Sequence, residues 1–200
     1  MDGQTYYYVK DASTGGLAAY FPYITDKDDV RYRMTSGLIT WWMKQDLTLI
    51  ERSYGYSIQN PSSYKIFFDY TDSDSYVGQT YGYANQATIS MSLKSYSDIK
   101  RFYSNRPENA NGISTTMSNP GFYADRVYAH ELTHAVMMNN LTSGVFGSLP
   151  EFITEGLAEL VHGGDDARSY SITHDLTNPD ALAASLDFSA GTGDNDTYAA

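Results

Sequence analysis

Cysteine is absent from this 200-residue chain, and positive charge is scarce. Without cysteine, the chain can form no disulfide framework, no thiolate zinc site and no cysteine nucleophile. Lys+Arg 13 against Asp+Glu 24 gives a formal net charge of −11. Nucleic-acid binding depends on clustered Lys and Arg side chains that neutralise phosphates, so we expect no nucleic-acid partner.

Long hydrophobic runs are missing as well. No apolar run approaches the roughly 20 residues of a membrane-spanning helix, so we expect no membrane partner. The opening residues MDGQTYYY hold no basic segment followed by an apolar one, so no Sec-type signal peptide is visible in this chain. The abundance of Asp, Gly, Ser and Tyr is typical of a secreted or cell-surface domain, which is the localisation that we predict.

The chain does contain enough apolar side chains for a core, because 42% of its residues are hydrophobic and 14% are aromatic. Its length predicts one domain over residues 1–200. We expect Gly55 to end a helix and Asn178 to cap the start of one. The apolar spacing predicts helices over 30–54, 96–103, 123–140, 150–162 and from Asn178-Pro179, and strands over 64–70 and 87–93.

The sequence HELTH at residues 130–134 carries the clearest chemical signal. Given four His and six Glu in the chain, chance would produce this His-Glu-x-x-His spacing about 0.002 times. Residues four apart share one face of a helix, so His130 and His134 can supply two nitrogen ligands to a zinc ion. Glu131 follows the first ligand directly, where its carboxylate can take a proton from a water molecule activated by the metal.

A catalytic zinc site needs a third protein ligand and an open position. The segment EGLAE at residues 155–159 offers two glutamates four apart, which lie on one helix face. Glu155 can bind the metal, and Glu159 can accept the second N–H of a ligating histidine, which fixes the tautomer of that ring. Gly156 is interpreted as a small residue where two helices approach each other closely.

HELTH, twenty intervening residues and then EGLAE resemble the gluzincin zinc metallopeptidases. This group includes thermolysin-like proteases, bacterial collagenases and flagellinolysins. The resemblance covers about residues 84–160, and it implies an α+β, zincin-like metalloprotease domain. In such a domain, the substrate-binding edge strand of a mixed sheet packs on a pair of active-site helices. The strand at 87–93 would then be the edge along which a peptide substrate lies antiparallel.

The same resemblance assigns a role to each residue of the two motifs. It makes His130, His134 and Glu155 the zinc ligands, Glu131 the general base, and Glu159 the partner of a ligating histidine. The family usually continues into a further helical subdomain that supplies a Tyr or His to stabilise the oxyanion. This chain reaches only residue 200, so its catalytic domain is expected to be truncated at the C-terminal end. Tyr198 and His174 are the two candidates for the oxyanion role.

We therefore expect a zinc-dependent endopeptidase that hydrolyses peptide bonds of protein or peptide substrates. Two alternatives remain: a surface or filament domain with a structural zinc site and no catalysis, or an aminopeptidase in which Glu151 binds the substrate N-terminus. Calcium has no supporting motif. The aspartates 69, 72, 74, 165 and 166 lack EF-hand spacing, and solvated loops are the favoured interpretation. The natural substrate and the oligomeric state are left open.

Overall fold

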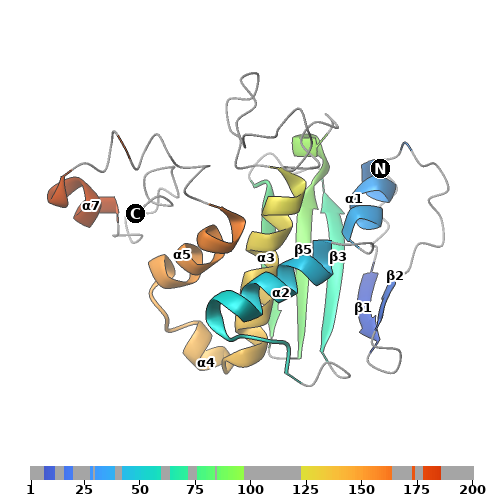
Figure 1. The fold of residues 1–200 in the computed structure, drawn as a ribbon, viewed down its shortest axis with the longest axis horizontal. Helices are drawn as coiled ribbons and strands as arrows, with labels where there is room; N and C mark the ends of the chain where they lie inside the picture. Colours follow the sequence, from blue (N-terminus) through green and yellow to red (C-terminus); the bar gives the residue numbers. More distant parts are fainter. Residues whose placement is uncertain are drawn as a thin grey trace.

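The fold is α+β, with a mixed β-sheet and most of the helices on one of its faces (Figure 1). The computed structural model describes residues 7–11, 16–19, 28, 30–38, 42–59, 64–71, 76–83, 85–96, 123–163, 173 and 178–185. The strands are β1 (Tyr7–Asp11), β2 (Gly16–Ala19), β3 (Lys65–Thr71), β4 (Gly78–Tyr83) and β5 (Gln86–Ser92). The helices are α1 (Val30–Gly37), α2 (Met43–Tyr54), the 3-10 helix η2 (Leu93–Tyr96), α3 (Ala124–Asn140), α4 (Ser143–Phe146), α5 (Glu151–His162) and α7 (Pro179–Ser185).

The strand order in the sheet is β2-β1-β3-β5-β4. Strands β3 and β5 run parallel, with Ile66 opposite Ala87 and Phe68 opposite Ile89. Strand β4 is antiparallel to β5, and β1 is antiparallel to both β3 and β2. The prediction of a mixed sheet is therefore confirmed.

The predicted edge position of the strand at 87–93 is wrong. Strand β5 lies between β3 and β4, and β4 has a neighbour on one side only among the described strands. Two of the polar positions of β5 are buried rather than solvated, because Ser90 and Ser92 are only 2% and 0% exposed. A hydrogen bond compensates for the burial of the Ser90 hydroxyl, because Ser90 Oγ lies 3.1 Å from the hydroxyl of Tyr76. Alternation of apolar and polar residues thus marked a central strand with small polar side chains on its second face.

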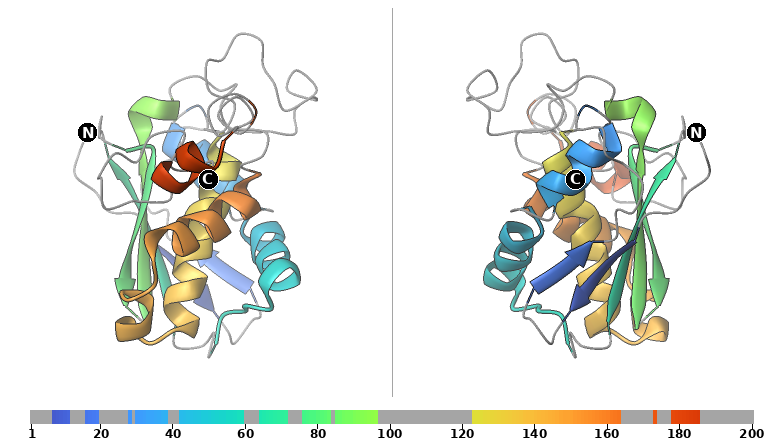
Figure 2. Two further views of the ribbon diagram at one scale, coloured as in Figure 1. Left: turned by 90° about the vertical axis from the view of Figure 1, so that its left-hand side faces the viewer. Right: turned by 90° about the vertical axis from the view of Figure 1, so that its right-hand side faces the viewer.

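Helix α3 runs along one face of the sheet, and α2 and α5 lie against α3 (Figures 1 and 2). An aromatic cluster joins these layers, since the ring centroid of Tyr128 on α3 lies 5.7 Å from that of Phe68 on β3 and 5.4 Å from that of Trp42 beside α2. The buried hydroxyl of Tyr64 donates a hydrogen bond of 2.7 Å to the carbonyl of Ala135. The face of α3 opposite this core is therefore fixed relative to the sheet, and it is the face that carries the histidines.

The single helix predicted over 30–54 is wrong, because the structure has two helices, α1 and α2, in this stretch. A Cβ atom on Gly37 would lie 2.7 Å from the ring of Trp42. The end of α1 therefore packs directly on the residue that precedes α2, a tertiary contact that helical periodicity does not reveal. The predicted end at Gly55 is confirmed: its φ is 71°, and its N–H donates to the carbonyl of Glu51 at 2.9 Å.

Most of the other predicted elements are confirmed. The predicted helices over 123–140 and 150–162 correspond to α3 and α5, and the strand over 64–70 corresponds to β3. Asn178 caps α7 as expected, since its Oδ1 accepts the N–H of Ala181 at 2.8 Å. The helix predicted over 96–103 lies almost entirely outside the described residues, which contain only its first position as the end of η2. Within the described part of the chain, no helix has the length and apolarity needed to cross a bilayer.

Candidate metal centre

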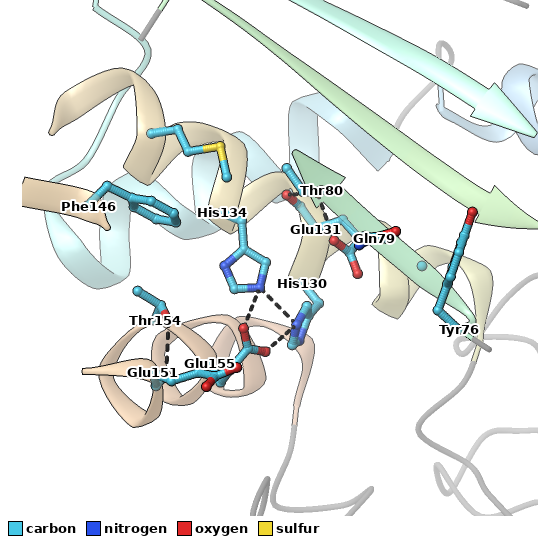
Figure 3. Close-up of a pocket in the computed structure, with 12 residues that line it drawn as sticks. Tyr76, Gln79, Thr80, His130, Glu131, His134, Phe146, Glu151, Thr154 and Glu155 are labelled. Carbon is cyan, nitrogen blue, oxygen red and sulfur yellow. Dashed lines mark hydrogen bonds and ion pairs between the residues drawn. The ribbon is translucent and has the colours of Figure 1, made fainter. Parts of the chain in front are cut away.

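Three side chains from two helices meet at one point, as Figure 3 shows. His130 and His134 lie one helical turn apart on α3, and their Nε2 atoms are 3.1 Å apart. The carboxylate of Glu155 on α5 reaches both rings, with Oε2 at 3.2 Å from His130 Nε2 and Oε1 at 3.3 Å from His134 Nε2. The structure therefore brings together the three residues that the sequence predicts as ligands.

The donor set of this cluster suits a metal ion. One candidate ligand atom from each of His130, His134 and Glu155 lies within 4.8 Å of the other two. Two imidazole nitrogens and one carboxylate oxygen are the ligand types of catalytic zinc sites. The three side chains are 12%, 10% and 18% exposed, so they are largely shielded but still open to solvent. This group could hold a metal ion.

Helix α5 supplies a second carboxylate to the same histidine. Glu159 Oε1 lies 3.2 Å from His130 Nδ1, and this glutamate is buried. Because one ring nitrogen is engaged by Glu159, the other nitrogen is directed towards His134 and Glu155. Helix α5 itself is held against α2, since the Tyr54 hydroxyl donates to the Leu157 carbonyl at 2.8 Å.

The carboxylates change the protonation of the cluster in the absence of a metal. Burial lowers the pKa of His130, but hydrogen bonds to Glu155 and Glu159 and the nearby carboxylate charges outweigh it and raise that pKa to about 10. Burial raises the pKa of Glu155, but hydrogen bonds and charges from His130 and His134 bring it well below its usual range. His130 and Glu155 therefore form an ion pair at neutral pH, and a metal cation would take the place of the proton on His130.

Glu131 lies on the opposite side of the histidines from Glu155, towards strand β4 (Figure 3). Its residue surface is only 6% exposed. The hydroxyl of Thr80 on β4 lies 2.7 Å from Glu131 Oε2 and 2.9 Å from the Glu131 backbone carbonyl. The predicted base is thus placed beside the cluster and contacts the strand that forms the sheet edge.

The cluster opens into a cleft of about 700 Å³ between β4 and the α3–α5 pair. The described lining includes three glutamates and two histidines but no Lys or Arg. The cleft is lined by Tyr76, Gly78, Gln79, Thr80, His130, Glu131, His134, Met138, Phe146, Glu151, Thr154 and Glu155. An extended chain could therefore lie along the strand edge with its backbone next to the cluster.

The interpretation of Gly156 is wrong. A Cβ atom on this glycine would meet no atom within 4 Å, so the close approach of α3 and α5 does not depend on it. Tyr198 and His174 lie outside the described residues, as do Asp72, Asp74, Asp165 and Asp166 of the calcium hypothesis.

Sequence reasoning also missed Thr80 and the whole of β4. The segment GQTYGY has two glycines and no alternation of apolar residues, so it carries no strand pattern.

Comparison of the chain with family models, curated proteins and solved structures finds no significant match in any of the three.

Proposed function

We propose that this chain is a zinc-dependent endopeptidase with a zincin-like fold and a gluzincin-type site, which hydrolyses peptide bonds of protein substrates. One observation carries the proposal: His130, His134 and Glu155 converge at the base of an open cleft, with Glu131 beside them. Two imidazoles and one carboxylate leave one position of a tetrahedral zinc site available. A structural zinc site normally has four protein ligands and needs no adjacent carboxylate base.

His130, His134 and Glu155 would hold the zinc ion. When bound, zinc would polarise the scissile carbonyl and lower the pKa of a water molecule towards about 7. Glu159 would keep His130 in the tautomer that presents Nε2 to the cation. Glu131 would accept the proton of the attacking water and deliver it to the leaving amine.

Strand β4 supports the choice of a peptide as substrate. Its outer side has no partner among the described strands, and Gly78, Gln79 and Thr80 of this strand line the cleft. An extended peptide can pair with the main chain of such an edge whatever its sequence. The expectation of a secreted or cell-surface enzyme rests on composition.

The substitution Glu131→Gln tests the proposal, because it removes the base and keeps the size of the side chain. We expect one zinc per chain in both proteins, measured by elemental analysis, and a fall in casein cleavage of at least about 10²-fold. Glu51→Gln, on the exposed surface of α2, is the matched control and should cleave like the wild type. Full activity of Glu131→Gln would contradict the mechanism.

Two cleavage assays separate the two alternatives. A domain with structural zinc would cleave casein neither with zinc nor after treatment with a chelator. An aminopeptidase would cleave free peptides and spare N-acetylated ones. The exposed Glu151 at the start of α5 lines the cleft and is the residue on which that second alternative depends.

A further inference from the structure

The hydroxyl of Thr80 contacts two oxygen atoms of the same residue. It lies 2.7 Å from Glu131 Oε2 and 2.9 Å from the Glu131 carbonyl oxygen. A threonine hydroxyl has one proton to donate, and the contact to Oε2 is the shorter of the two. The short contact to Oε2 is therefore the principal hydrogen bond, and it joins strand β4 to helix α3.

Gly78 lies two residues earlier on the same face of β4 and meets the same side chain. A Cβ atom at this position would lie 2.9 Å from Glu131 Oε1 and 3.0 Å from Glu131 Cγ. It would also lie 2.6 Å from Cγ1 of Val127, one turn earlier on α3. The missing side chain of Gly78 is therefore what lets Glu131 lie directly beneath the strand.

We propose that β4 is the positioning element for the base of this site: Thr80 holds Oε2 of Glu131, and Gly78 leaves the space that the Glu131 side chain occupies beneath the strand. The inference rests on the proposed function and extends it to the strand. Thr80 acts through Glu131 and is a positioning residue. Without its hydrogen bond the glutamate side chain gains rotamers, and a misplacement of about 1 Å can cost a reaction about 10²-fold.

The kinetic test compares Thr80→Val, which keeps the shape and removes the hydroxyl, with Thr80→Ser, which keeps the hydroxyl. We expect Thr80→Val to lower kcat by about 10–10²-fold, while KM and zinc affinity stay within about 3-fold of the wild type. Thr80→Ser should restore kcat to within about 3-fold of the wild type. Equal kcat in Thr80→Val and wild type, or equal losses in both variants, would overturn the inference.

A control variant separates a positioning effect from a general loss of structure, and a variant of Gly78 tests the role of the glycine. Thr88→Val makes the same chemical change on the neighbouring strand β5, where Thr88 is hydrogen-bonded to Tyr81. Thr88 pairs with Tyr81 and so faces the side of the sheet opposite Thr80, and this variant should leave kcat unchanged. Gly78→Ala adds a single methyl group above Oε1 and should lower kcat while zinc remains bound. A normal kcat in Gly78→Ala would contradict the role assigned to this glycine.

A spectroscopic test needs no activity. The chain contains only six glutamates, so ¹³C labelling of glutamate should give six side-chain carboxyl signals. The signal of Glu131 is identified by its loss in Glu131→Gln. Thr80→Val should shift that one signal and leave the other five in place, and Thr80→Ser should return it close to its original position.

The two readouts also distinguish failure of the inference from failure of the proposed function. An unmoved Glu131 signal in Thr80→Val would overturn the inference even if the wild type cleaves peptides. A zinc-loaded wild type that cleaves no peptide would overturn the proposed function. The assignment of Thr80 to a catalytic site would then fall with it, whatever the signal does.

Discussion

The buried contact between Glu159 and His130 makes a quantitative prediction about metal affinity. The substitution Glu159→Ala removes the carboxylate that lies 3.2 Å from His130 Nδ1, in a site where the two side chains are 7% and 12% exposed. Removing one partner of a buried hydrogen bond costs about 1–3 kcal/mol. At about 1.4 kcal/mol for each factor of ten, zinc affinity should fall by about 10–10²-fold. Glu159→Gln keeps an oxygen acceptor of the same reach, and its loss should stay below about 10-fold.

The assay is a competition for zinc against a chromophoric chelator of known affinity, at pH 7.5 and fixed ionic strength. Glu51→Ala on the exposed face of α2 is the control for removal of one negative charge, and its dissociation constant should match that of the wild type. A dissociation constant for Glu159→Ala within 3-fold of the wild type would refute the reasoning. Equal losses in Glu159→Ala and Glu159→Gln would show that charge, and not the acceptor oxygen, sets the affinity.

Two further predictions concern stability. Gly156→Ala should raise the free energy of unfolding, measured by urea denaturation, by about 0.5–1 kcal/mol and leave peptide cleavage unchanged. The reason is that it removes a glycine from a helix interior and the new methyl group meets open space. A destabilised variant would show that this position is packed. Burial, and then the charge of Asp125, raise the pKa of Asp46 well above its usual range, so folding favours its protonated form. The stability that Asp46 contributes to the folded state is then present below about pH 4. It is lost as the pH rises through the folded-state pKa of this carboxyl. Relative to Asp46→Asn, the free energy of unfolding of the wild type should fall as the pH rises from 4 to 8, and a constant difference across that range would contradict the assignment.

The parts of the site that follow from local helix geometry could be predicted from the sequence. His130 and His134 share a face of α3 because of the 3.6-residue period, and Glu155 and Glu159 share a face of α5 for the same reason. The convergence of the two helices could be predicted because two imidazoles alone do not complete a catalytic zinc site and a third ligand was needed from elsewhere in the chain. These residues could be named without knowing how the sheet is arranged.

The parts that depend on contacts distant in sequence could not be predicted. Strand β4 is a strand because β5 pairs with it, and its own residues GQTYGY give no apolar alternation. The contact of Thr80 with Glu131 joins residues 51 positions apart and leaves no trace in either local pattern. The break between α1 and α2 reflects the packing of Trp42 on Gly37, which apolar spacing cannot reveal. The prediction for Gly156 was wrong because the EGLAE motif identifies the glycine but does not show in which direction its missing side chain would point.

The contacts among His130, His134 and Glu155 bear on the order of folding and metal binding that the proposed function requires. Small zinc domains whose ligands lack partners remain unfolded until a cation arrives. Here His130, His134 and Glu155 satisfy one another, and the aromatic core of Trp42, Phe68 and Tyr128 contains no ligand. We therefore expect the chain to reach its native structure without the metal and to bind it afterwards. A preparation stripped by a chelator should be recoverable by adding the ion back, without any refolding step.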